Sequence, residues 1–205
     1  MLIIADEVMT GFGRTGRWFA SEHFDLSPDI ITMAKGASSG YWPLGICAFS
    51  EDVRGVIADS PRGLVHGFTY SHNPVGSAVG LAVLQRIKDL NLVESAETRG
   101  ERLKAGMSSA LAGHPHVGDI RGKGLLLGIE LVADHAAKTP FHRHRRVAET
   151  VSTRARELGL IVYPSTGCAD GTNGDVLLIG PPLVINDSEI DQIVEMTAAA
   201  LNDLR

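Results

Sequence analysis

Short apolar runs alternate with glycine-rich segments in the first part of the chain. Residues 1–8, 29–34 and 44–50 contain such runs, and the second of them is continuous and rich in β-branched side chains. Runs of this kind are typical of strands that are buried on both faces of a parallel sheet. Three glycines interrupt residues 9–17, and residues 36–43 form a second glycine-rich segment. We therefore predict three strands joined by loops.

Helical patterns flank these strands. Residues 18–25 are compatible with a short helix, and Leu26-Ser27-Pro28 would end it. The polar and aromatic segment 66–73 is predicted to be a loop, and Pro74 is suited to the first turn of a helix over residues 74–89. Small residues in that helix would let it lie close to a sheet.

Longer amphipathic segments replace the short runs from about residue 92 onward. The pattern predicts, in order, a helix from Val93 to Leu111, a strand with glycine breaks at 121–132, a helix at 144–158, a strand at 160–163, a loop at 164–174, a strand at 175–179 and a last helix that starts near 186–188. We expect two domains: residues 1–91 form part of an α/β sheet domain with mostly parallel strands, and residues 92–205 form a small α+β domain.

Two charged residues stand at the carboxyl ends of predicted strands. Asp6 follows Leu2-Ile3-Ile4-Ala5, and Lys35 follows Ile30-Ile31-Thr32-Met33-Ala34. Ligands of open α/β sheets bind at this edge. A lysine that is partly removed from water has a lowered pKa and can attack a carbonyl group. A carboxylate and an amine there indicate a cofactor that carries both a basic ring nitrogen and an aldehyde.

Two other types of site fit the same region less well. Gly11-Phe12-Gly13-Arg14-Thr15-Gly16 matches the dinucleotide fingerprint, but that motif should follow its strand at once and requires an acidic residue at the end of the next strand, where this chain has Lys35. Asp6 and Glu7 could form a metal pair, but no third ligand stands at a supporting spacing. We therefore expect neither a dinucleotide nor a metal.

Composition excludes several functional classes. The formal net charge is −5, and no basic stripe of the kind that binds nucleic acid dominates the sequence. Cys47 and Cys168 match no zinc-binding or CxxC spacing and are expected to be free thiols of a reducing compartment. There is no secretory signal pattern and no apolar run long enough to span a membrane, so we expect a cytoplasmic protein.

The chain resembles the class III pyridoxal-phosphate-dependent aminotransferases, the omega-transaminase family of fold type I, and the resemblance covers essentially all of it. The motifs that carry the resemblance are Asp6-Glu7-Val8-Met9-Thr10-Gly11-Phe12-Gly13-Arg14-Thr15-Gly16, Asp29-Ile30-Ile31-Thr32-Met33-Ala34-Lys35-Gly36, Gly67-Phe68-Thr69-Tyr70-Ser71-His72-Asn73-Pro74, Arg121-Gly122-Lys123-Gly124-Leu125, Gly128-Ile129-Glu130-Leu131 and Pro181-Pro182-Leu183.

The resemblance implies a role for four of these residues. Asp6 would pair with the pyridine nitrogen of pyridoxal 5′-phosphate, and Val8 would pack on a face of the ring. Lys35 would form a Schiff base with the aldehyde and then carry a proton between the substrate carbon and C4′. Thr69 would bind the cofactor phosphate of a partner subunit, because the family builds its sites across a homodimer interface. The expected reaction transfers an amino group from an amine or omega-amino acid to a keto acid, with pyruvate as the default acceptor.

The substrate-binding residues are less clear. Many relatives hold a substrate carboxylate with an arginine shortly before the Pro-Pro motif, but no Lys or Arg occurs here from Glu157 to Leu204. Either another arginine, such as Arg121, binds that carboxylate, or the substrate is selected differently. His72 is a further candidate for lining the site.

Members of this family are much longer than 205 residues. The resemblance therefore implies the C-terminal half of an aminotransferase, with residues 1–91 as the end of the cofactor-binding large domain. Two alternatives stay open: a truncated remnant that is not catalytic, and a class III decarboxylase.

Overall fold

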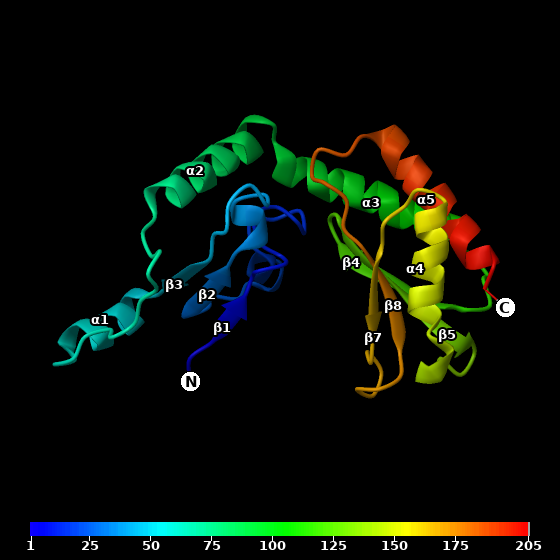
Figure 1. Ribbon diagram of the computed structural model, residues 1–205, viewed down its shortest axis with the longest axis horizontal. Coiled ribbons are helices and arrows are strands. Elements are labelled where there is room, and N and C mark those ends of the chain that lie inside the picture. The colour runs from blue at the N-terminus through cyan, green and yellow to red at the C-terminus, as the bar shows by residue number, and fades with distance from the viewer. Residues whose placement is uncertain (205) are drawn as a thin grey trace. The chain divides into compact units, whose positions relative to one another are not determined.

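The computed structural model describes residues 1–204, and they form two compact units (Figure 1). The first unit is Met1–Glu94, and the second begins at Ser95. Helix α3, Leu92–Ala110, starts at the end of the first unit and lies mostly in the second.

A three-stranded sheet in the order β1-β2-β3 forms the centre of the first unit. Strands β1 (Ile4–Asp6) and β2 (Ile30–Met33) are parallel, and β3 (Ile46–Phe49) runs antiparallel to β2. The sheet is therefore mixed, whereas the sequence had suggested mostly parallel strands. The reason is the connection from β2 to β3, which contains a single short 3₁₀ turn and no crossover helix, so that β3 returns alongside β2.

Helix α2 of the first unit begins where its capping residue predicts. Helix α2, Pro74–Asp89, has Asn73 as its N-cap, whose side chain accepts hydrogen bonds from the amides of Val75 and Gly76. A 3₁₀ helix at Ala20–Phe24 takes the place of the short helix expected at 18–25. Sequence reading missed helix α1, Glu51–Asp59, although Ser50 caps it and two acidic residues open its first turn.

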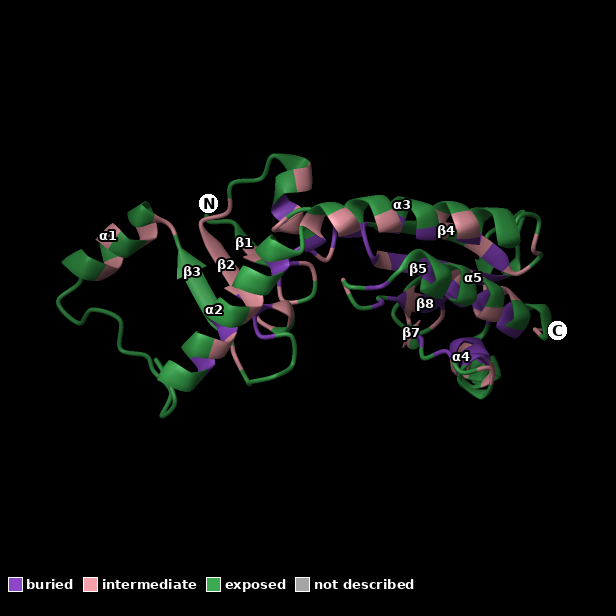
Figure 2. Cartoon of the chain, turned by 90° about the horizontal axis from the view of Figure 1, so that it is seen from above, coloured by how far each residue is buried: buried purple, intermediate pink, exposed green. Residues whose placement is uncertain are grey.

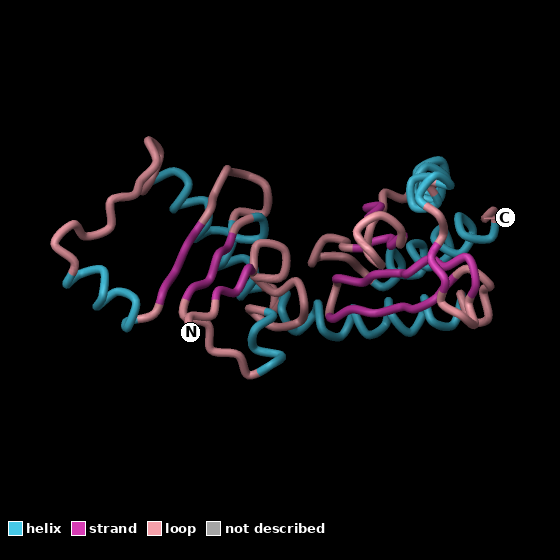
Figure 3. Tube along the Cα trace, turned by 90° about the horizontal axis from the view of Figure 1, so that it is seen from below, coloured by secondary structure: helices cyan, strands magenta, loops and turns pink. Residues whose placement is uncertain are grey.

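The second unit contains an antiparallel sheet in the order β4-β5-β8-β7, with the short strand β6 (Thr139–Pro140) beside β5. Figure 3 draws these strands in magenta. The single strand predicted at 121–132 is wrong: the segment contributes to a hairpin of β4 (Val117–Lys123) and β5 (Leu126–Asp134). Gly124, with φ +52°, is the first residue of the two-residue turn, a position that favours glycine.

Strands β7 and β8 and two helices complete the second unit. Strand β7 is Tyr163–Thr166, β8 is Asp175–Ile179, helix α4 is Val147–Glu157 and helix α5 is Asp187–Asn202. Asn186 and Glu189 form a capping box at the start of α5, as the sequence around 186–188 indicates.

The continuous hydrophobic core lies in the second unit. It joins buried side chains of α3, β5, α4, β8 and α5, including Leu103, Ile129 and Ile190, which are fully buried. The first unit has few buried apolar side chains among its described residues, and every residue of β3 is exposed, as its green colour in Figure 2 shows.

Candidate functional site

The carboxyl ends of β1 and β2 bring the two predicted charged residues to one edge of the sheet. The parallel register pairs Asp6 with Thr32, and Lys35 follows the end of β2 directly after Ala34. The Asp6 side chain is exposed, and its Oδ1 accepts a hydrogen bond from the Val8 amide at 3.0 Å. The backbone thus places a carboxylate and an amine where an α/β sheet binds its ligands.

The backbone of Lys35 has a left-handed conformation. Its φ is +38°, and it opens the short 3₁₀ turn Lys35–Ala37 after a residue, Ala34, that is itself outside the helical and strand regions. Non-glycine residues with positive φ are uncommon and cost free energy.

Glu7, next to Asp6, is a buried carboxylate with three donors. It accepts hydrogen bonds from the hydroxyl of Thr10 and from the amides of Ala20 and Ser21. Burial by itself would raise the pKa of Glu7, but these hydrogen bonds outweigh it and hold the pKa below 4.5. The sequence had suggested Glu7 only as a metal ligand. The hydroxyl of Thr10, three residues later, is the feature that could have indicated a hydrogen-bonded carboxylate.

A hollow of about 990 Å³ lies at the same end of the first unit. Residues 32–34 at the end of β2, the 42–47 segment and part of the 66–77 segment line it, together with Val8. Of the predicted site residues, Val8 and His72 belong to this lining. Among the described residues, Asp6, Lys35 and Thr69 are not part of it.

Thr69 lies in an exposed turn that leads to helix α2. The turn is held by the Ser71 hydroxyl, which accepts a hydrogen bond from the Phe68 amide at 3.0 Å, and by the Ser71 amide, which donates to the Phe68 carbonyl. The structure therefore does not bring Thr69 into contact with Asp6 or Lys35 through any described hydrogen bond.

Arg121, the candidate for holding a substrate carboxylate, already has acidic neighbours. Its guanidinium donates to Glu130 on β5 and to Asp119 at 3.0 Å, and both hydrogen bonds raise the pKa of Arg121. Arg121 is therefore an exposed residue of the β4–β5 hairpin whose charge is already paired with two acidic side chains. This pairing leaves Arg121 a weaker candidate for binding substrate.

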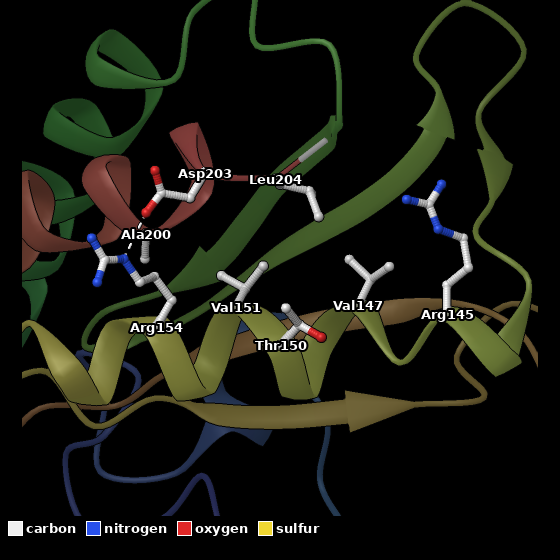
Figure 4. A pocket seen from close by; sticks show the side chains of 8 residues that line it. All are labelled: Arg145, Val147, Thr150, Val151, Arg154, Ala200, Asp203 and Leu204. Carbon is white, nitrogen blue, oxygen red and sulfur yellow. Dashed lines mark hydrogen bonds and ion pairs between the residues drawn. The ribbon is translucent and has the colours of Figure 1, made fainter.

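A smaller hollow of about 250 Å³ lies between α4 and α5 in the second unit (Figure 4). Arg145 and Arg154 are at its rim, and Val147, Val151 and Ala200 are among the apolar residues that line it. Arg154 donates to Asp203 across the hollow at 2.6 Å and also pairs with Glu157. The acidic partners balance the charge of Arg154.

Metal clusters and membrane-spanning helices are the other kinds of site to consider within residues 1–204. No group of three or more His, Cys, Asp or Glu side chains lies close enough to hold a metal ion. None of the helices found there combines the length and the apolar character that crossing a membrane requires.

Comparisons with known proteins extend this picture. Residues 1–201 match the family model described as "Aminotransferase class-III". A taurine–pyruvate aminotransferase of Bilophila wadsworthia is 37% identical over 198 residues, which is 95% of this chain and 43% of that protein.

Solved structures match over the same portion. A transaminase from the marine bacterium Virgibacillus is 40% identical with a TM-score of 0.91, covering 98% of this chain and 45% of that one. A thermostable (S)-enantioselective omega-transaminase from Thermomicrobium roseum is 38% identical with a TM-score of 0.89, covering 99% and 43%. The chain thus spans somewhat less than half the length of these relatives.

Proposed function

The chain belongs to the class III aminotransferase family. We propose that it transfers an amino group from an amine or omega-amino acid to a keto acid, with pyruvate as the acceptor. The cofactor of the proposed reaction is pyridoxal 5′-phosphate. The acceptor is suggested by the taurine–pyruvate relative, whose name specifies pyruvate.

The observation that carries the proposal is the pair Asp6 and Lys35 at one sheet edge, with Lys35 held in a left-handed backbone conformation. The donor set fits the cofactor: a carboxylate suits a protonated ring nitrogen, and a primary amine suits an aldehyde. Val8 and the residues at the end of β2 line a hollow at this edge.

Asp6, Val8 and Lys35 would divide the work of the proposed reaction. Asp6 would hold the proton on the pyridine nitrogen, and Val8 would pack on a ring face. Nζ of Lys35 would hold the aldehyde carbon of the cofactor and, once the substrate amine has displaced it, would move a proton between the substrate carbon and C4′. When bound, the cofactor supplies an electron sink for the negative charge that develops on the substrate carbon.

Thr69 is proposed to bind the cofactor phosphate of a partner subunit in a homodimer. Its exposed turn supports this role, because the flanking Phe68 and Tyr70 side chains are 74% and 81% exposed and are available to a second subunit. Large exposed aromatic side chains are enriched where proteins associate.

The charge distribution does not assign an arginine to the carboxylate of a keto acid or amino acid substrate. No Lys or Arg occurs from Glu157 to Leu204, and Arg121 is paired with Asp119 and Glu130. A substrate carboxylate bound near strands β7 and β8 would therefore lack the bidentate partner that an arginine provides.

A second candidate is a chain that is not catalytic by itself and acts only with another polypeptide. Two observations favour it: the chain matches under half of its relatives' length, and the first unit exposes apolar strand residues such as Ile4, Ile46 and Phe49.

The test is alanine formation from pyruvate by the purified 205-residue chain, with pyridoxal 5′-phosphate and a panel of amine donors. We expect slow turnover that Lys35→Ala abolishes and that Lys123→Ala, a change at an exposed lysine of β4, leaves intact. A wild-type rate no higher than that of Lys35→Ala would reject the transferase function for this chain and support the non-catalytic alternative.

A further inference from the structure

We propose that Glu7 is a positioning residue, which holds the segment from Thr10 to Ser21 in place so that Asp6 and Lys35 keep their positions at the sheet edge. The inference rests on the proposed function only in giving Asp6 and Lys35 their tasks. The holding role itself follows from the contacts of Glu7.

The Glu7 side chain is buried, and both of its carboxylate oxygens accept hydrogen bonds. The residue is 2% exposed, and one carboxylate oxygen accepts from Thr10 and from the Ala20 amide at 2.9 Å, while the other accepts from the Ser21 amide at 2.7 Å. Hydrogen bonds to a charged acceptor are stronger than those between neutral groups. A single side chain thus ties the end of β1 to the start of the 3₁₀ helix Ala20–Phe24.

The backbone of Glu7 makes a second set of links. Its amide donates to the Thr32 carbonyl on β2 at 2.9 Å, and its carbonyl accepts from the Gly11 amide at 2.9 Å. Gly11 has no room for a side chain, because a Cβ there would lie 2.9 Å from the backbone carbonyl oxygen of Glu7. Strand β2 and the glycine-rich loop therefore meet at the residue that follows Asp6.

The loop held by Glu7 reaches the other side of the site. A Cβ on Gly36, the residue after Lys35, would lie 3.2 Å from the Phe12 Cβ and 3.4 Å from the Gly11 carbonyl oxygen. Phe12 is buried and packs edge-on against Phe19 at 5.6 Å between ring centroids. Contacts thus run from Glu7 through the loop to the backbone that presents Lys35.

The experiment measures amide hydrogen exchange by NMR in the wild-type chain and in four variants. The reporter is the Val8 amide, which donates to the Asp6 carboxylate, and the reference is the Ile87 amide of helix α2 in the same unit. Glu7→Gln replaces one accepting oxygen by an NH₂ group, which would face a backbone donor. Glu22→Gln is the matched control, because Glu22 is exposed and accepts only the Phe19 amide at 2.8 Å among the described hydrogen bonds.

Two further variants separate hydrogen bonding from packing. Thr10→Val removes the hydroxyl that donates to Glu7, and Thr10→Ser keeps it while removing a methyl group. We expect exchange at Val8 to rise about tenfold or more in Glu7→Gln and Thr10→Val, and to stay within about twofold in Glu22→Gln and Thr10→Ser. Exchange at Ile87 should not change in any variant.

The inference is overturned if Val8 exchanges in Glu7→Gln as it does in the wild type, or if Val8 and Ile87 accelerate together. If Glu7→Gln does not fold, the Thr10 pair decides, since a structural role for side-chain volume would make Thr10→Ser the more harmful change. The result is independent of cofactor binding. Failure of Lys35 to react with the cofactor would reject the proposed function and leave the exchange result standing.

Discussion

At the scale of single residues, the backbone at Lys35 is in a conformation that costs free energy. Lys35, two residues after the end of β2, has a strained left-handed conformation, and Gly36 then allows the Phe12 loop to approach closely. Sequence reading found Asp6 and Lys35 because apolar runs end in charges there. It could not find the holding role of Glu7, because its partners Ala20 and Ser21 lie 13 and 14 residues away and act through backbone amides.

The close approach at Gly36 makes a prediction about stability. Gly36→Ala should lower the free energy of unfolding by about 1 kcal/mol, because the new Cβ forces Phe12 to move. The control is Gly45→Ala, where no atom lies within 4 Å of the added methyl group. Chemical denaturation of both variants checks this, and an equal effect of the two changes would refute it.

The charge of Glu7 makes a prediction about pH. Its pKa in the folded chain is lowered from 4.5, so its stabilising contribution is fully present above pH 4.5 and is lost as the pH falls through the folded pKa. The difference in stability between wild type and Glu7→Gln should therefore be largest near neutral pH and shrink in acid. Denaturation curves at pH 7 and at lower pH values test this; a difference that grew in acid would contradict the buried, charged carboxylate.

At the scale of elements, caps and loops decided where sequence reading succeeded. The N-cap residues Asn73 and Asn186 predict the starts of α2 and α5, and both helices begin there. The β4–β5 hairpin was read as one strand because glycine breaks within an apolar run do not show which break reverses the chain. Its turn at Gly124 lies against Gly100 of α3, a tertiary contact that no local pattern reveals.

That contact makes a prediction about helix α3. A Cβ on Gly100 would lie 2.2 Å from the Gly124 carbonyl carbon, a distance that only backbone movement can relieve. Gly100→Ala should therefore destabilise the second unit by about 2–4 kcal/mol, although alanine favours helices. Ser109→Ala, at an exposed position of the same helix, should have little effect. Thermal unfolding of the two variants checks the contrast, and a gain in stability for Gly100→Ala would disprove the contact.

At the scale of the whole molecule, the described core is unevenly divided. The continuous cluster of buried apolar side chains runs from Ala96 to Leu201, within the second unit. The first unit carries the candidate site but exposes Ile4, Val56 and Leu81 by 64%, 75% and 68%. Apolar runs in the sequence show which side chains could be buried, but burial depends on what packs against them, which local periodicity does not report.

This division predicts unequal protection. Backbone amides of β5 and β8 should exchange much more slowly than those of β1 and β3, because local opening costs less where few apolar contacts are lost. Hydrogen exchange followed by mass spectrometry of peptides measures both units in one sample. Equal protection of the two sheets would show that the first unit is stabilised by interactions that its burial does not reveal.

The most direct test of the central claim asks whether Lys35 binds the cofactor covalently. The purified chain is incubated with pyridoxal 5′-phosphate, reduced with sodium borohydride, digested and mapped by mass spectrometry. Lys35 is exposed, not partly removed from water as the sequence suggested, and Lys123 is exposed as well. We predict a phosphopyridoxyl label on Lys35 at cofactor concentrations that leave Lys123 unlabelled, and a reduced yield in Asp6→Asn. Equal labelling of Lys35 and Lys123, or none at Lys35, would contradict the assignment of this sheet edge as the cofactor site.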